Sequence, residues 1–144
     1  MKKFLFCTIV MVLANSLFAV GNRLPITNKE KQIIIKTSRI KKNTTLKLIS
    51  ILNRIQNKKD LLRVKDKIKT TLFTQVYCTH RPEYKNILIK VFKKSDLKTF
   101  MKFRKWLLSL APNMESLEVK MKLLLNKVMN LPGCRHIVAG IIMD

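Results

Sequence analysis

The side chains with the most to offer a binding partner form a basic ladder in the C-terminal half of the chain. Lys98, Lys102 and Lys105 stand at positions i, i+4 and i+7, with Arg104 and Trp106 beside them. On a helix this spacing places three ammonium groups on one face, where they could follow a row of sulfates or phosphates. The alternative is an ordinary solvated face, because lysines occupy the outside of every helix that the sequence predicts. The ladder is therefore a candidate polyanion-binding site with a plain structural alternative.

Side chains suited to catalysis are scarce. Acid–base chemistry needs carboxylates held close together, whereas the chain has 8 acidic residues, most of them at expected helix starts where capping explains them. A thiol–imidazole pair of Cys78 and His80 is conceivable, but a cysteine with a possible disulfide partner in an exported protein is usually bridged. The 3 glycines form no phosphate-binding loop, and the cysteine spacing is unlike that of zinc sites. We therefore expect no enzyme activity, no cofactor and no metal centre.

The N-terminus predicts export. Two lysines at residues 2–3 precede an apolar stretch over residues 4–14, and small residues follow, so that cleavage fits best after Ser16 or Ala19. The stretch is shorter than the roughly 20 residues needed to cross a bilayer, which makes an uncleaved anchor the weaker alternative. We therefore expect a signal peptide over 1–19 and a secreted, extracellular domain over 20–144, periplasmic in a bacterium.

The net charge is strongly positive. Loss of residues 1–19 removes 2 of the 30 basic side chains and none of the 8 acidic ones, which leaves 28 against 8, or +20. Such a field attracts sulfated glycosaminoglycans and anionic membrane surfaces, which an exported protein meets more readily than nucleic acid. A genomic bias toward Lys, Ile and Asn codons would give the same composition with no polyanion partner. Charge alone therefore does not establish a binding site.

Two cysteines remain after residues 1–19, Cys78 and Cys134. In an oxidising compartment they most simply form one disulfide, which would close a loop of about 57 residues and stabilise the fold by roughly 4 kcal/mol. The triplet from Asn43 to Thr45 is an N-glycosylation acceptor in a eukaryote, which would place a turn there on the surface.

Hydrophobic periodicity predicts an all-α fold, a small bundle of four to five helices with short connections. The core helices are expected to begin at Thr45, Leu61, Pro82, Ser95 and Asn113. Residues 29–42 are either a short helix or an extended basic arm, and the apolar tail over 137–143 is expected to pack against the bundle.

The helix predicted from Ser95 carries the basic ladder. Ser95 is expected to cap it, and its core-facing side is expected to hold the stem of Arg104 with Leu97, Phe100, Met101, Leu107 and Leu108. The four or so residues after it reach only ~13 Å, whereas a helix of about fifteen residues is ~22 Å long. The last two core helices are therefore expected to form an antiparallel hairpin.

The segment LKTFMKFRKWLLSLAPNMESLEVKMKLLLNKVMNLPGC, residues 97–134, resembles the last two helices and terminal cysteine of short-chain helical cytokines of the interleukin-4 and interleukin-13 group. LKLISILNRIQNKKDLLRVKD resembles the first helix of that group and the start of the connection after it, and QVYC resembles the cysteine-bearing start of its second helix. The resemblance implies a fold whose last two helices run parallel, joined by a long return connection. It also implies a secreted ligand that bridges cell-surface receptor chains, with Arg104 and Lys105 in the receptor-contacting helix.

Two functional hypotheses with candidate binding residues follow from the sequence, and an exported structural or scaffold protein with an unnamed partner is a third. The first is a cytokine-like extracellular ligand that binds a receptor. The second is an exported polyanion- or membrane-binding protein without enzymatic activity, such as a host-defence factor or a microbial or parasite effector. In both, the candidate binding residues are the same four: Lys98, Lys102, Arg104 and Lys105.

Overall fold

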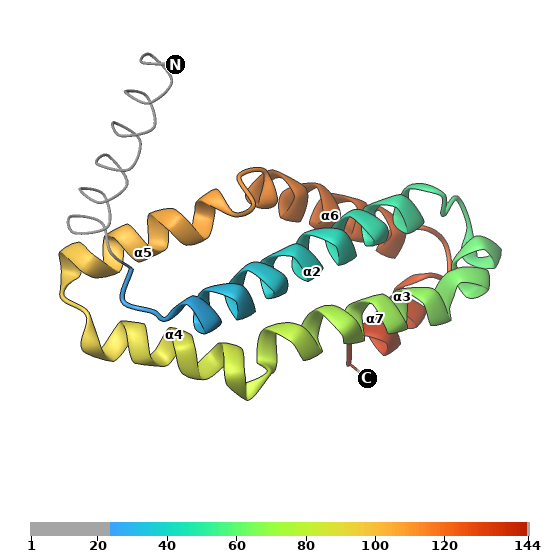
Figure 1. The fold of residues 1–144 in the computed structure, drawn as a ribbon. Helices are drawn as coiled ribbons and strands as arrows, with labels where there is room; N and C mark the ends of the chain where they lie inside the picture. The colour runs from blue at the N-terminus through green and yellow to red at the C-terminus, as the bar shows by residue number, and fades with distance from the viewer. Residues whose placement is uncertain (1–23, 144) are drawn as a thin grey trace, which may run out of the picture.

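A computed structural model describes residues 24–143, in which every regular element is a helix (Figure 1). The predicted all-α class is confirmed, although the described part of the chain holds six helices where four to five were expected. They are α2 (Asn28–Asn53), α3 (Lys58–His80), α4 (Pro82–Lys94), α5 (Leu97–Ser109), α6 (Met114–Met129) and α7 (Arg135–Met143). The predicted signal peptide lies outside the described residues.

The longest helix, α2, runs through the middle of the molecule (Figure 1). A capping box begins it: the Thr27 hydroxyl accepts from the Glu30 amide at 3.2 Å, and the Glu30 carboxylate accepts from the Thr27 amide at 2.9 Å. No proline or glycine follows before Asn53, so the segment over 29–42 and the predicted first core helix form one rod of ~39 Å. The undecided segment is therefore a helix.

The other helices line the two sides of α2. In Figure 1, α3 and α4 run back along one side, and α5 and α6 run forward along the opposite side. The break between α3 and α4 falls at Arg81, whose backbone is extended (φ −62°, ψ 137°) because the ring of Pro82 disfavours helical geometry in the residue before it. The break between α5 and α6 falls at Ala111-Pro112, directly before the helix start predicted at Asn113.

The predicted hairpin of the last two core helices is wrong. α5 and α6 follow one another in the same direction, and α6 packs on α2 and α7 (Figure 1). A short connection joins helices end to end as readily as it reverses the chain, and here the apolar side of α6 meets the C-terminal half of α2 only if the chain continues forward. The in-line pair gives the molecule its length.

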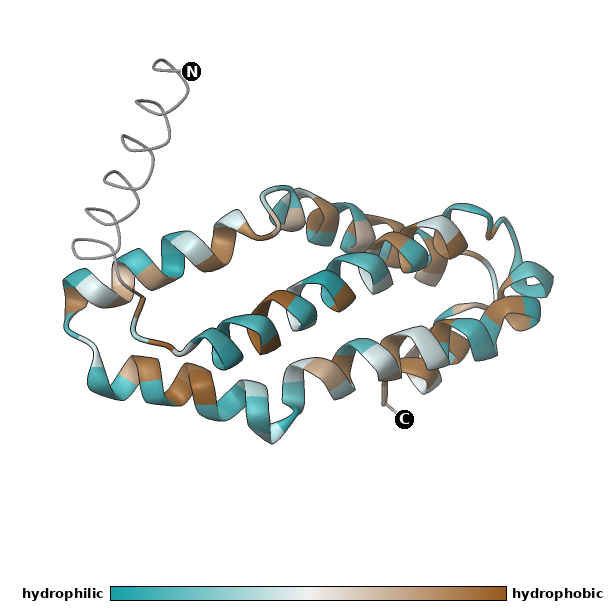
Figure 2. Cartoon of the chain, in the orientation of Figure 1, coloured by the Kyte–Doolittle hydropathy of each residue, from teal (hydrophilic) through white to brown (hydrophobic). Residues whose placement is uncertain are grey.

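The molecule has two apolar cores, and α2 contributes residues to both. Hydrophobic positions recur along the helices of the molecule (Figure 2). The core at the α4–α5 end is built on four buried residues: Ile34, Ile87, Val91 and Phe103. The core at the α3–α6–α7 end is built on nine: Leu48, Leu52, Ile55, Leu61, Ile68, Val128, Cys134, Val138 and Ile141. α5 is thus held only by the smaller core.

A polar layer separates the two cores along α2. Thr45 is fully buried, donates to the Lys41 carbonyl at 2.8 Å and accepts from the Gln75 amide at 2.7 Å. The Lys41 ammonium pairs with Glu118 of α6 at 3.0 Å. Because buried polar groups cost free energy unless they are bonded, the Thr45–Gln75 bond favours this register of α2 against α3, while the exposed Lys41–Glu118 pair adds little.

An ion pair ties the start of α2 to α4. The Lys90 ammonium donates to both carboxylate oxygens of Glu30 at 2.8 Å. These bonds and the Thr27 amide hold the pKa of Glu30 below its ordinary value of 4.5. Since that pKa is lowered by folding, the contribution to stability is complete above pH 4.5 and is lost as the pH falls through the folded-state pKa.

Glu30→Gln is therefore expected to lower the free energy of unfolding by about 1–2 kcal/mol at pH 7, since a cap and an ion pair are both weakened. The difference from the parent should shrink steadily below pH 4.5. Urea unfolding at several pH values measures it. A difference that stays constant down to pH 2 would contradict the role given to the ionised carboxylate.

The turn between α6 and α7 needs its glycine. Gly133 has φ +74°, in the left-handed region, and a Cβ there would lie 3.2 Å from the Lys58 side chain. Gly133→Ala is expected to destabilise the fold by about 1–2 kcal/mol. Gly140→Ala is the matched control, because Gly140 lies in α7 with open space around it, and it should stabilise by about 0.5–1 kcal/mol. Thermal unfolding of the two variants checks the opposite signs.

Candidate functional site

The basic ladder lies on α5, whose N-cap residue is Asp96. The Asp96 carboxylate accepts from the Thr99 amide at 2.7 Å, and bonding with Thr99 is the main cause that holds its pKa below the ordinary value. The cap is therefore Asp96 and not the predicted Ser95, which instead ends α4. A carboxylate at the positive end of the helix dipole suits this position better than a hydroxyl.

One side of α5 is anchored in the smaller core. Phe103 is 3% exposed, and the partly buried Phe100, Trp106, Leu107 and Leu110 pack around the same cluster. The Trp106 ring lies 5.9 Å from that of Phe103, and the Lys31 ammonium of α2 lies 5.7 Å from the Trp106 ring centre. Trp106 therefore belongs to the core and does not stand beside the ladder as a free aromatic platform.

The opposite side of α5 is a second apolar stripe. Leu97, Met101 and Leu108 are 77%, 48% and 58% exposed. Their spacing of four and seven residues places them on one face, because eleven residues make three turns of a helix. The prediction that these three residues face the core is wrong. The face of α5 that packs in the smaller core is a different one, and it holds Phe103.

The structure places all four predicted binding residues beside this stripe. Lys98, Lys102, Arg104 and Lys105 surround a shallow hollow of about 470 Å³ whose remaining lining is Met101 and Leu108. Lys98, Arg104 and Lys105 are exposed, and Lys102 is half-buried. We call this surface the α5 outer face: the three apolar residues together with the four cations. The cations were predicted from sequence, whereas the exposed apolar stripe between them was missed.

A groove runs along the other flank of α5, between it and α4. Its volume is about 600 Å³, and Arg104 lines both this groove and the hollow of the α5 outer face. Phe92 of α4 is 71% exposed and meets Phe100 of α5 edge to face, with ring centres 5.9 Å apart. Apart from Arg104 and Lys93, the lining is apolar: Leu88, Ile89, Phe92, Phe100, Phe103 and Leu107.

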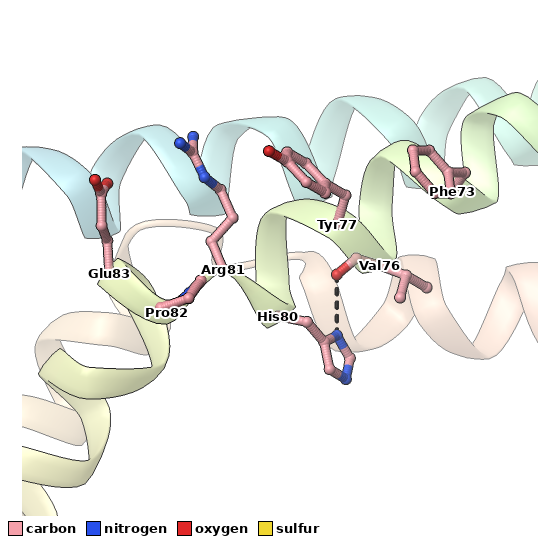
Figure 3. Close-up of a pocket in the computed structure, with 7 residues that line it drawn as sticks. All are labelled: Phe73, Val76, Tyr77, His80, Arg81, Pro82 and Glu83. Carbon is pink, nitrogen blue, oxygen red and sulfur yellow. Dashed lines mark hydrogen bonds between the residues drawn. The ribbon is translucent and has the colours of Figure 1, made fainter.

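The corner between α3 and α4 forms another hollow, of about 560 Å³, in which His80 and Arg81 already have partners within the chain (Figure 3). His80 Nδ1 lies 2.9 Å from the Val76 carbonyl, and the Arg81 guanidinium lies 5.6 Å from the Tyr77 ring centre. Cys78 and His80 are two residues apart on one helix, a spacing that turns side chains away from each other. The thiol–imidazole pair considered from sequence is therefore not brought together.

The predicted disulfide is not formed. Cys78 and Cys134 are both free thiols. Gly133, next to Cys134, lies against Lys58 at the start of α3, whereas Cys78 stands twenty residues further along the same helix, ~30 Å away. A disulfide needs Cα atoms about 4.4–6.8 Å apart, so the bridge is incompatible with this fold. Cys134 is fully buried in the larger core and acts there as a small apolar residue.

The candidate glycosylation residue, Asn43, is exposed as predicted, but it stands inside α2 and not in a turn. Its neighbour Thr45 is fully buried in the polar layer. A glycan at Asn43 would therefore have to be added before α2 packs against α3.

Within residues 24–143, no group of three or more His, Cys, Asp or Glu side chains could hold a metal ion. None of the helices described there is long and apolar enough to cross a membrane. Comparison with protein-family models, with curated proteins and with solved structures gives no match to this chain.

Proposed function

We propose that the chain is an exported protein, freed of residues 1–19, that binds anionic membrane surfaces through the α5 outer face and catalyses no reaction. The observation that carries the proposal is the mixture on that face. Three exposed apolar side chains stand among four cations on one short helix. This combination is typical of helices that lie in the interface of an anionic bilayer.

The two parts of the face contribute comparable free energies. Each cation near an anionic bilayer is worth about 1 kcal/mol, or about 4 kcal/mol for the four. Full burial of an aliphatic side chain is worth about 1.5–3 kcal/mol, so three side chains that begin about half exposed contribute roughly 2–4 kcal/mol. Binding is therefore expected only when charge and apolar contact act together, which gives preference for anionic over neutral lipid.

Lipid explains the face better than a sulfated glycosaminoglycan does. A sulfated chain would pair with the four cations but would leave Leu97, Met101 and Leu108 in water. The receptor-ligand alternative rests on the cytokine resemblance, which implies a parallel pair of helices with a long return connection. α5 and α6 do run in the same direction, but they lie end to end with residues 110–113 between them, not side by side with a long connection (Figure 1). The geometry therefore supports the lipid surface more strongly.

Vesicle sedimentation tests the proposal on the exported protein, with its N-terminus determined by mass spectrometry. The protein should sediment with phosphatidylglycerol vesicles at about 0.1 M salt, remain free with phosphatidylcholine vesicles, and be released near 1 M salt, where the Debye length falls to about 3 Å. Equal binding to both lipids would contradict the role of the cations. Retention on heparin beyond that on a cation exchanger of equal charge density, without vesicle binding, would favour a glycosaminoglycan. Met1 still attached would contradict export by cleavage.

A further inference from the structure

The groove between α4 and α5 has the features of a binding site for a single acyl chain. Its floor includes the buried Phe103, and its walls are the half-buried Leu88 and Leu107 with the edge-to-face pair of Phe92 and Phe100. A volume of about 600 Å³ falls within the ~300–1,000 Å³ of pockets that hold small ligands. The groove is open to solvent, so a linear chain could enter it.

The charged groups of the groove select the sign of the ligand. Lys93 of α4 and Arg104 of α5 are exposed cations, and the lining contains no carboxylate. The nearest acidic residue in sequence, Asp96, is occupied with the Thr99 amide. A carboxylate head group bound against this lining could pair with an ammonium and a guanidinium, and the guanidinium can bind it through two parallel hydrogen bonds.

We propose that this groove binds one long-chain fatty acid, with the acyl chain over Phe103 and the carboxylate between Lys93 and Arg104. The proposal is independent of bilayer binding by the α5 outer face, because it concerns monomeric ligand in solution. Only Arg104 belongs to both surfaces.

The single tryptophan of the chain gives a local signal for this site. Trp106 packs against Phe103, with ring centres 5.9 Å apart. An acyl chain that contacts the Phe103 ring is therefore close to the indole. Bromine quenches indole fluorescence at short range. The exported protein is titrated with 9,10-dibromostearate below its micelle concentration, and the expected result is saturable quenching of Trp106.

The chain length and head group should decide affinity. Displacement of the dibromostearate by saturated fatty acids should strengthen by about twofold to fourfold per added methylene from 10 to 14 carbons. The methyl ester and the alkylammonium of the same length should displace at least tenfold more weakly. No saturable quenching, or equal displacement by acid and ester, would overturn the proposal.

Matched variants locate the site. Phe92→Asp places a carboxylate at the mouth, and Arg104→Glu reverses the guanidinium; both residues are exposed, so the fold should persist. Each variant should weaken dibromostearate quenching at least tenfold. Phe73→Asp, an equally exposed phenylalanine on α3, should quench as the parent does. Undiminished quenching in Phe92→Asp and Arg104→Glu would place the chain elsewhere and would contradict the assignment.

Discussion

Replacement of Lys98, Lys102 and Lys105 together by glutamate is expected to weaken binding to phosphatidylglycerol vesicles by more than about 100-fold. Loss of three cations alone removes about 3 kcal/mol of attraction, and the new carboxylates add repulsion. All three residues lie on the α5 outer face, away from the buried Phe103, so the variant should fold as the parent does. Vesicle sedimentation as a function of lipid concentration measures the change.

The control has the same change in net charge placed elsewhere. Lys47 of α2 with Lys59 and Lys67 of α3 are exposed lysines outside α5. Their joint replacement by glutamate should weaken vesicle binding by much less, since it lowers only the long-range field. Equal losses in the two triple variants would show that net charge, and not the α5 outer face, controls binding.

Replacement of the apolar stripe distinguishes binding to anionic lipid from binding to other polyanions. Serine at Leu97, Met101 and Leu108 should reduce vesicle binding by about 10-fold or more while leaving retention on heparin unchanged. The three side chains gain free energy only when they leave water. A matching loss on heparin would indicate that the substitutions disturb the cations themselves.

Phe103→Ala is expected to lower the free energy of unfolding by about 3–5 kcal/mol, the usual cost of removing a buried phenylalanine. Phe103 is the only residue of α5 that is fully within the smaller core, at 3% exposure. The cavity would also loosen Trp106, whose emission should shift to the red before the helix content changes. Urea unfolding followed by tryptophan fluorescence and by circular dichroism measures both effects.

Phe73→Ala is the matched control for that substitution, because Phe73 is 70% exposed on α3. Its effect should stay within about 0.5 kcal/mol. A similar loss in both variants would mean that α5 is not anchored through Phe103. The difference matters for function, since a detached α5 could not present its outer face in a fixed orientation.

Local backbone chemistry made several helix boundaries predictable. Pro82 opens α4, Ala111-Pro112 separates α5 from α6, and Leu131-Pro132-Gly133 separates α6 from α7, as their sequences indicate. Proline and glycine act through the conformation of their own residue and its neighbour, so no tertiary contact is needed to read them. These helix boundaries could therefore be predicted, whereas residues 29–42 were left open between a helix and an extended arm and are the first half of α2.

The arrangement of the helices depends on distant partners and could not be read in the same way. The direction of α6 after Pro112 is set by the apolar residues of α2 that it meets, such as Leu48 and Leu52. The same holds for the two cysteines, whose sequence separation is compatible with a disulfide. Cys78 lies near the end of α3, whereas the turn that holds Cys134 lies against the start of that helix. Sequence separation carries no information on which end of a helix a later turn will touch.

The error on α5 concerns the site itself. Seven apolar or partly apolar side chains cover more than half of the helix circumference, so the sequence offers two candidate stripes. The stripe with Phe103 is buried because it meets Ile34 and Val91 in the smaller core. A helical wheel shows both stripes, and if one packs in the core, the stripe of Leu97, Met101 and Leu108 stays exposed. An exposed apolar stripe flanked by cations favours an interfacial role.

The most direct measurement places a polarity-sensitive fluorophore on the α5 outer face. In a Cys78→Ser background, where Cys134 is fully buried, the probe is attached at Met101→Cys or, as a control, at Leu123→Cys on the exposed side of α6. Addition of phosphatidylglycerol vesicles should shift the emission to the blue at residue 101 and leave it unchanged at residue 123, and salt near 1 M should reverse the shift. A bound protein whose probe at residue 101 stays in water, or whose two probes shift alike, would contradict the assignment of α5 as the membrane-contacting face.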